Sequence, residues 1–298
     1  MKTSFFLLLL FSYSLLAQTG KIERKIYTAL RTNPHPPTID GKLNDAIWKK
    51  VAIGDGFIQS EPVERDTSSE KTYFKICYDK NNLYVLIHAR DSQPEKISAR
   101  LARRDEIDDS DVVGLFLDSY LDHRTAFEFS VNAAGVKRDA VFSNDEFNQD
   151  KSWEPVWEAK TTINDSGWVA EMRIPFNQLR FSGSPNQTWG LEVYRYIYRK
   201  QELDVWQFIP KEAPGFVSNF GYLKGINNIR TPKRIELLPY SVSEYHAYEK
   251  EPGNPFAPGR SFTGAGGLDG KIGLSGNLTV DFTINPDFGQ VEADPSEV

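Results

Sequence analysis

The sequence is nearly free of cysteine, with 1 Cys, 2 Met and 4 His among 298 residues. The single cysteine, Cys77, excludes an intrachain disulfide. It lies in an apolar segment, residues 72–78, that is typical of a strand, so we expect a buried apolar residue rather than a nucleophile. The histidines are scattered and have no spacing typical of metal ligands.

Sequence motifs for nucleotide and acyl chemistry are also absent. The chain has no phosphate-binding loop, no dinucleotide-binding fingerprint and no Gly-x-Ser-x-Gly elbow. Its formal net charge is −6 and no basic patch interrupts the acidic background, which argues against nucleic acid as a partner. Aromatic residues, by contrast, reach 13%, a composition that suits β-sheets and surfaces that stack on flat ligands.

The chain opens on a pattern typical of a secretory signal. Lys2 precedes an apolar run from Phe5 to Leu16, and the small residue Ala17 follows. The run is too short to cross a bilayer as a helix, so cleavage is the better interpretation. We therefore predict a signal peptide over residues 1–18 and an exported protein of the cell envelope.

Period-two alternation of apolar and polar residues recurs along the chain, whereas helical periodicity is almost absent. This pattern predicts an all-β fold, an antiparallel β-sandwich over residues 33–226. Strands are predicted at residues 71–78, 83–89, 112–117, 126–132, 137–142, 157–163, 168–174, 190–199 and 204–209. Residues 43–51 suggest a short helix, with Asn44 as its N-cap and Trp48 facing the core.

The composition changes after Ile226. Residues 227–260 are expected to form a linker and a first extended segment. In residues 261–298, apolar side chains alternate with small or polar ones around residues 278–285, which suits a membrane β-barrel but also a solvent-facing hairpin. A closed barrel needs at least about eight strands, so we expect only the first strands of a barrel, in a chain that ends as if truncated.

An acidic run at residues 105–111 is a candidate metal site. Asp108, Asp109 and Asp111 lie in one loop before a strand and would supply the oxygen ligands that Ca²⁺ prefers. Arginines at positions 100, 103 and 104 favour the alternative, a loop held by salt bridges. Calcium is the only cofactor that the sequence suggests.

Tryptophan side chains are candidate platforms for sugar rings, whose axial C–H groups pack on aromatic faces. Trp168 and Trp189 open predicted strands and are expected to be structural. Trp153 lies in a predicted loop and is the one expected to be exposed. Trp206 is a further candidate for stacking on a ligand.

Several segments, in order, resemble the signature of family 9 carbohydrate-binding modules. They are Pro37-Thr38-Ile39-Asp40-Gly41 through Trp48, Tyr78-Asp79 through Val85, Asp111-Val112-Val113 through Asp118, Gly167-Trp168-Val169 through Pro175, and Phe220-Gly221-Tyr222-Leu223. The resemblance spans nearly the whole predicted sandwich. It implies a non-catalytic module of the kind attached to xylanases and other glycan-active proteins, often with bound calcium.

The resemblance also implies where a sugar would bind. Members of the family clamp a terminal sugar between two Trp side chains, at positions where this chain has Ile107-Asp108 and Ala213 to Phe216. The family's central-strand Glu corresponds to Gly114, its Arg to Ser130, and its Asn is retained as Asn132. Phe216 is the side chain that can stand in for a clamp wall. The predicted ligand-binding residues are therefore Trp153, Phe216, Asn132 and Trp206.

The rest of the chain, including the segment Asn285-Pro286-Asp287-Phe288-Gly289-Gln290-Val291, resembles a family of uncharacterised envelope proteins, domain of unknown function 5916. In that family such a sandwich precedes an outer-membrane barrel. The resemblances imply a glycan- or polysaccharide-binding module for carbohydrate catabolism or sensing, tethered to the outer membrane. Two alternatives stay open: a glycoside hydrolase with two catalytic carboxylates, and a structural or docking sandwich that has lost the sugar site.

Overall fold

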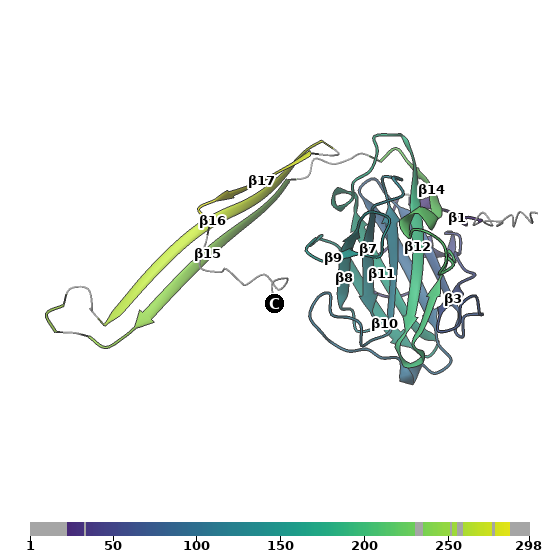
Figure 1. Cartoon of the computed structure of the whole chain (residues 1–298), viewed down its shortest axis with the longest axis horizontal. Helices are drawn as coiled ribbons and strands as arrows, with labels where there is room; N and C mark the ends of the chain where they lie inside the picture. The colour runs from purple at the N-terminus through teal and green to yellow at the C-terminus, as the bar shows by residue number, and fades with distance from the viewer. Residues whose placement is uncertain are drawn as a thin grey trace, which may run out of the picture.

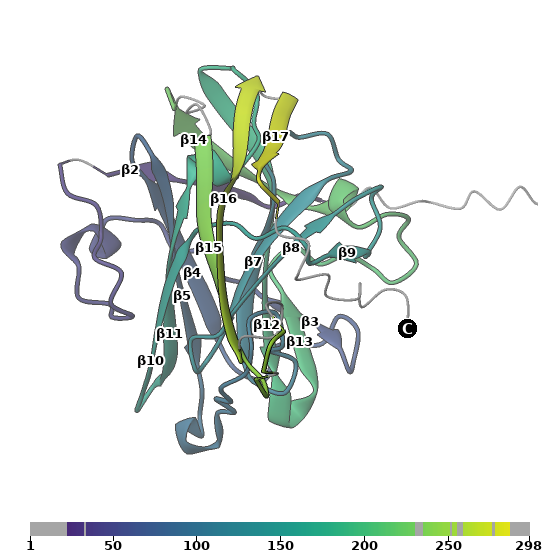
Figure 2. The same cartoon turned by 90° about the vertical axis from the view of Figure 1, so that its left-hand side faces the viewer.

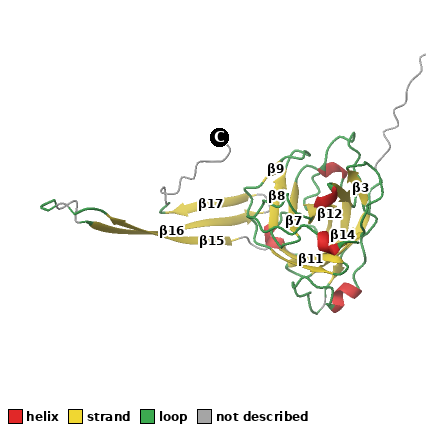
Figure 3. Cartoon of the chain, turned by 90° about the horizontal axis from the view of Figure 1, so that it is seen from below, coloured by secondary structure: helices red, strands yellow, loops and turns green. Residues whose placement is uncertain are grey.

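The computed structural model describes residues 23–32, 34–229, 235–250, 252–254, 259–275 and 278–286, so the predicted signal peptide lies outside the described residues. Two β-sheets pack face to face, and a third, three-stranded sheet extends away from them (Figure 1). Among the described residues the helices are 3-10 turns of three or four residues, visible as short red segments in Figure 3. The predicted all-β sandwich is confirmed.

The larger sheet has nine strands. Its main path is β1 (Ile26–Thr28), β14 (Gly221–Asn227), β12 (Asn186–Ile197), β6 (Val112–Asp118), β7 (Ala126–Asn132), β8 (Lys137–Phe142) and β9 (Gln149–Asp150). Two short strands extend it beside the C-terminal half of β12, namely β13 (Glu202–Val205) and β3 (Ile58–Glu61). The strand β13 ends at Val205, so the strand predicted to run to residue 209 is wrong over its last four residues.

The smaller sheet has the order β10 (Glu158–Asn164), β11 (Gly167–Pro175), β5 (Asn82–Arg90), β4 (Thr72–Tyr78) and β2 (Leu30–Arg31). Figure 2 shows the two sheets as separate layers. Most pairs are antiparallel, but the edge strands β1 and β2 pair in parallel with β14 and β4. The sequence pattern missed both of these strands, which precede the predicted start of the sandwich at residue 33.

The core lies between the two sheets, and it explains why apolar and polar residues alternate along the strands. From the larger sheet, Leu115, Phe129 and Val193 point inward, and from the smaller sheet Ile87 and Met172 meet them; all five are fully buried. Strand β6 is buried along its whole length, as its apolar sequence predicted, because a second apolar cluster covers its outer face. That second cluster positions the candidate site.

The outer face of the smaller sheet is covered by residues 37–51, in which the predicted helix is only the 3-10 turn η1 (Ala46–Lys49). The predicted N-cap, Asn44, is wrong, because Asp45 precedes the turn and makes no side-chain cap. The carboxylate of Glu171 on β11 holds the segment: it accepts hydrogen bonds from the backbone N–H groups of Asp40 and Gly41 and from the indole of Trp48. Trp48 is buried, as predicted.

The sheet β15 (Ile235–Ala247), β16 (Arg260–Ser275) and β17 (Leu278–Ile284) is an antiparallel meander. Its register places Leu237, Gly270 and Phe282 on one face, next to the pair Ile235 and Ile272. The strands expected after residue 260 are therefore present. Among the described residues, no helix has the length and hydropathy needed to cross a membrane.

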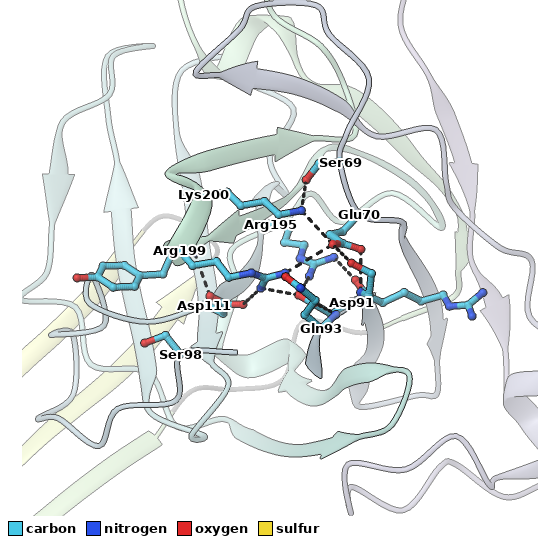
Figure 4. Close-up of polar contacts among 12 residues, drawn as sticks. Ser69, Glu70, Asp91, Gln93, Ser98, Asp111, Arg195, Arg199 and Lys200 are labelled. Atoms are coloured by element: carbon cyan, nitrogen blue, oxygen red, sulfur yellow. Dashed lines mark hydrogen bonds and ion pairs between the residues drawn. The ribbon is translucent and has the colours of Figure 1, made fainter. Parts of the chain in front are cut away.

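A buried cluster of charges closes one end of the sandwich core (Figure 4). Arg195 on β12 has no exposed surface; its guanidinium donates to the backbone oxygen of Arg90 at 2.7 Å and lies 3.3 Å from the Asp91 carboxylate. Arg199 makes a two-pronged pair with Asp91 at 2.7 and 2.8 Å. Lys200 completes the cluster by pairing with Glu70 at 2.9 Å.

Asp204 carries a pH dependence of stability at the edge of this cluster. It lies opposite Arg195 in the β12–β13 register and is fully buried. Burial, reinforced by the Glu202 carboxylate, raises the pKa of Asp204 to about 7, whereas an unfolded Asp titrates near about 4. The folded state therefore retains a proton that the unfolded state loses, so this group makes the protein less stable as the pH rises from about 4 to about 7.

Asp204→Asn removes that titration. We expect the free energy of unfolding of the variant, relative to the parent, to rise by about 3 kcal/mol between about pH 4.5 and 7.5, because one unit of pKa corresponds to about 1.4 kcal/mol. Urea denaturation at several pH values measures the difference. A difference that is the same at both ends of the range would contradict the assignment.

A candidate ligand pocket on the outer face of the larger sheet

A pocket of about 610 Å³ lies on the outer face of the larger sheet. Its floor is a lattice of outward-facing side chains on five neighbouring strands. One row of directly paired residues runs Arg138 on β8, Ser130 on β7, Gly114 on β6, Tyr194 on β12 and Val205 on β13. Paired residues share a face of the sheet, so these side chains all point to the pocket side.

The next row places a ring between two carboxyl groups. Phe116 on β6 is paired with Glu192 on β12 and with Glu128 on β7. Phe116 stacks on Tyr194 with ring centroids 5.3 Å apart and meets the edge of Phe216 at 5.2 Å. The floor of the pocket is therefore aromatic at its centre and acidic on both sides.

Only glycine fits at position 114, because its neighbours leave no room for a Cβ atom. A Cβ atom built there would approach the Cβ of Ser130 and the Cε1 of Tyr194 to 2.7 Å, because the Tyr194 ring lies over the glycine. The resemblance places the family's central-strand Glu at this position, and in this chain the Tyr194 ring occupies the space beside the glycine.

A hydrogen-bonded network forms the charged end of the pocket. The Tyr194 hydroxyl donates to Glu128 Oε1 at 2.7 Å, and Arg138 Nη2 lies 3.0 Å from both that hydroxyl and that carboxylate oxygen. Arg138 Nη1 also donates to Asp108 at 2.8 Å. Burial raises the pKa of the Tyr194 phenol, and the negative charge of Glu128 raises it further. The phenol therefore stays neutral and keeps its proton for donation.

Glu192 presents a second, separately held carboxyl group. Its Oε1 accepts the backbone N–H groups of Val193 and Gln207, both at 2.9 Å, while its Oε2 has no partner in the described structure. Burial raises the pKa of Glu192 to about 8 despite these two hydrogen bonds. At neutral pH the group is mostly protonated and is able to donate a hydrogen bond.

A loop carrying Phe216 forms one wall of the pocket, and Asp145 holds that loop. Asp145 Oδ1 accepts the backbone N–H groups of Phe216 at 2.9 Å and Ser218 at 2.7 Å, and Oδ2 accepts the Ser218 hydroxyl at 2.6 Å. Gly215 adopts φ +80°, and a Cβ there would lie 2.1 Å from Asp145 Oδ2. The exposed ring of Phe147 packs against the ring of Phe216, with the two ring centroids 5.0 Å apart, and extends the wall.

Of the four predicted ligand-binding residues, the structure brings only Phe216 to the pocket. Trp206 belongs to the core between the sheets, where it packs against Phe74, and it does not line the pocket. Asn132 is fully buried; its amide oxygen accepts the N–H groups of the turn that follows β7, and its amide nitrogen donates to the backbone oxygen of Arg100. These two predictions are corrected, because both side chains are used by the fold.

Trp153 is also placed differently from the prediction. It is half-buried rather than exposed, and it lies against Phe127 and Phe129 with ring centroids 4.9 and 5.5 Å away. Phe127 and Phe129 belong to the core between the sheets, whereas the pocket lies on the opposite face of β7. Trp153 is therefore not part of the pocket.

The three predicted calcium ligands diverge. Asp108 pairs with Arg138 at the pocket, Asp109 is exposed and lies 3.5 Å from Arg100, and the buried Asp111 accepts the backbone N–H of Tyr198. Across the described residues no three His, Cys, Asp or Glu side chains converge as a metal site would require. The acidic loop therefore does not fit the predicted calcium cage, and its arginine partners match the alternative of a loop held by salt bridges.

Sequence reasoning missed most of the pocket, although the sequence contains a signal for it. Glu128 and Glu192 are the single carboxylates of the strands Ala126–Asn132 and Asn186–Ile197, and each has an apolar residue on both sides in the sequence. A charged residue in such a strand is rarely buried without a specific partner. That these two flank Phe116 depends on the pairing of three strands, which the order of residues in the chain does not state.

Comparisons with known proteins agree with the fold. The family model described as carbohydrate family 9 binding domain-like matches residues 39–205, and the one described as domain of unknown function (DUF5916) matches residues 231–298. Endo-1,4-beta-xylanase C of Paenibacillus barcinonensis is 26% identical over 157 residues, which are 53% of this chain but only 13% of the xylanase.

Two solved structures are similar to the sandwich. A candidate carbohydrate-binding protein from Bacteroides uniformis has a TM-score of 0.53 and 14% identity, covering 68% of this chain and 99% of that one. A family 9 carbohydrate-binding module from Caldicellulosiruptor kristjanssonii, solved with cellotriose, has a TM-score of 0.48 and 21% identity, covering 67% of this chain and 93% of that one. At such identities the first of these likenesses concerns the fold alone.

Proposed function

The chain belongs to the carbohydrate family 9 binding domain-like family, and we propose that it binds glycan in the pocket above Phe116. The observation that carries the proposal is the position of the pocket. It lies between the two segments where the resemblance places the sugar clamp, and Asp108, Ala213 and Phe216 from those segments line it. The volume is within the range of about 300–1,000 Å³ that is typical of small-ligand sites.

The chemistry of the pocket suits a neutral sugar. A pyranose presents an apolar face to an aromatic ring and hydroxyl groups around its edge, and the pocket offers rings flanked by groups that donate and accept hydrogen bonds. With Glu192 mostly protonated, the charged side chains of the lining are Asp108, Glu128, Arg138 and Lys211, which cancel. No surplus positive charge is present to favour an acidic sugar.

A glycan array followed by isothermal titration calorimetry on the full chain tests the proposal. We expect binding of at least one neutral plant or bacterial glycan, and competition by its terminal mono- or disaccharide. An array without any retained glycan, confirmed by calorimetry with xylan and glucan fragments, would reject the proposal and favour the docking alternative.

Phe216→Ala is expected to weaken glycan binding at least about fivefold, because it removes a wall of the pocket and about 1–3 kcal/mol of aromatic contact. Trp153→Ala is the matched control: it removes the Trp that the sequence favoured but leaves the pocket intact, so its affinity should equal that of the parent. Titration calorimetry of both variants shows whether Phe216 or Trp153 is the aromatic residue that contacts the glycan. Equal losses would contradict the proposal that this pocket is the binding site.

The same proposal places the protein at the cell envelope. It is supported by the predicted signal peptide and by the one apolar face of the three-stranded sheet, where Leu237 and Ile235 are more than half exposed. An apolar face opposite a polar one is the pattern of strands that meet lipid on one side. Fractionation of cells producing the native protein tests this, and recovery in a soluble fraction without detergent would contradict it.

A second candidate function is glycoside hydrolysis, favoured by the two buried carboxyl groups that flank Phe116. Glu192 is mostly protonated at neutral pH, as a general acid must be, and Glu128 lies on the other side of the ring. Release of nitrophenol from nitrophenyl glycosides, abolished in Glu192→Gln, would establish it. Without turnover in the parent protein, the pocket is a binding site only.

A further inference from the structure

The pocket changes character from one side of the sheet to the other. On strands β7 and β8 the side chains that reach it are charged, Glu128 and Arg138. On the opposite side β13 contributes Leu203 and Val205, which are paired with Tyr196 and Tyr194 of β12. Neighbouring strands lie about 4.8 Å apart, so about 19 Å of floor separates the charged strand β8 from the apolar strand β13.

The apolar side continues into the wall above it. Ile209 and Pro210 follow β13 and line the pocket, and both are half-buried, as are Leu203 and Val205. The four side chains themselves carry no hydrogen-bonding group, and the polar residues that line the pocket on this side are Ser60, Gln207 and Lys211. Half-buried apolar surface next to a polar cavity is stabilised when a ligand covers it and removes it from water.

An unsubstituted sugar matches only part of this surface. It carries hydroxyl groups around its whole edge, and hydroxyls placed against Leu203, Val205 and Ile209 would lose water without gaining partners, which disfavours binding. The charged side, by contrast, supplies Glu128, Arg138 and the Tyr194 hydroxyl for such groups. The two sides therefore call for two different parts of one ligand.

We propose that the pocket takes a glycan unit bearing an apolar substituent, an aryl or acyl group, with the sugar over Phe116 and the substituent on Leu203, Val205 and Ile209. This inference rests on the proposed function and narrows its ligand class. It makes the substituent a determinant of specificity, and it assigns β13 a role in ligand selection. None of the ligand positions implied by the family resemblance lies on β13.

Titration calorimetry with matched glycosides tests the inference on the full chain. Phenyl and methyl β-D-glucopyranoside share one sugar, as do phenyl and methyl β-D-xylopyranoside, so each pair differs only in the aglycone. We expect the phenyl glycoside of at least one pair to bind at least tenfold more tightly than its methyl partner. Leu203→Ala should reduce that ratio at least threefold, whereas Leu101→Ala, a change at an 85% exposed side chain that does not line the pocket, should leave it unchanged.

The outcomes separate the inference from the function on which it rests. Equal affinities for phenyl and methyl glycosides would overturn the inference and leave glycan binding standing. Failure of all four glycosides, together with a negative glycan array, would overturn glycan binding itself. Phenol binding as tightly as phenyl glucoside, or a ratio that Leu203→Ala does not change, would also overturn the inference, because the sugar or β13 would then play no part.

Discussion

Replacing Trp48 with alanine is expected to lower the free energy of unfolding by about 3–5 kcal/mol. Trp48 is 2% exposed and packs against Tyr84, Leu86 and Val169 on the outer face of the smaller sheet. Truncation leaves a large cavity and also removes the hydrogen bond from the indole to Glu171 Oε1, which is 2.7 Å long. Urea denaturation of the variant and the parent measures the loss.

Trp48→Phe separates the two parts of this loss, the apolar packing and the hydrogen bond to Glu171, and Trp153→Ala serves as a comparison. Trp48→Phe keeps most of the apolar volume but removes the indole donor, so its loss should be smaller and should report mainly on the Glu171 contact. Trp153→Ala, which the sequence alone predicts to be neutral, should now cost an intermediate amount, because Trp153 is half-buried against Phe127 and Phe129. A Trp48→Ala protein as stable as Leu101→Ala, a change at an 85% exposed side chain, would contradict this account.

The contact between Glu171 and Trp48 also explains two segments of the family resemblance that lie far apart in the chain. The turn at Asp40-Gly41 donates two backbone N–H groups to the same carboxylate that holds the Trp48 indole. Gly41 adopts φ +78°, which suits glycine at this turn. The sequence identified both segments and the burial of Trp48. It did not reveal that one carboxylate joins them, because the joining residue lies 123 positions away from Trp48.

The strands were predictable for a local reason and the pocket was not. Each strand is encoded by its own alternation, and turns such as residues 164–167 carry residues that bond their own backbone, as Asn164 does to Ser166. The pocket floor, by contrast, depends on which strands are neighbours. Phe116 and Glu128 become adjacent only through the β6–β7 register, and the sequence cannot state that pairing.

The errors in the predicted site have the same origin. Asn132 and Trp206 are residue types that recognise sugars well, but in this fold one caps a turn and the other fills the core. Asp111 looks like a metal ligand from its neighbours in sequence, yet at its place directly before β6 the side chain is buried and points toward Arg199. Residue type and spacing suggest what a side chain is able to do, and the direction in which its strand points it determines what it does.

Arg195→Leu is the second change expected to have a large effect, a loss of about 3–5 kcal/mol in the free energy of unfolding. Arg195 is the one fully buried cation in the cluster of Figure 4, and Asp91 and Asp111 both lie in its field. Its removal leaves these buried carboxylates with only the partial compensation of Arg199. An uncompensated buried charge costs more than the ion pair itself contributes, so the loss comes mainly from the groups left behind.

The pH dependence of this loss distinguishes buried charge from lost packing. Burial alone raises the pKa of Asp91, but hydrogen bonds from Arg199 and the charges of Arg199 and Arg195 outweigh burial and hold the pKa below its ordinary value. A carboxyl with a lowered folded pKa stabilises the fold above its unfolded pKa, and that contribution disappears as the pH falls through the folded value. In Arg195→Leu the Asp91 pKa rises, so part of the contribution is already gone at neutral pH.

The deficit of Arg195→Leu relative to the parent should therefore be largest near about pH 7. It should shrink toward about pH 4, because the Asp91 carboxyl of the variant, with its raised pKa, takes up a proton while that of the parent stays ionised. Arg173→Leu is the matched control, because it breaks a pair with Glu158 in which both side chains are largely exposed, and such pairs contribute about 0–1 kcal/mol. Urea denaturation of both variants at the two pH values decides the matter. A deficit that does not change with pH would mean that Arg195 stabilises the sandwich by packing, and that the charges around it are neutralised by their other partners.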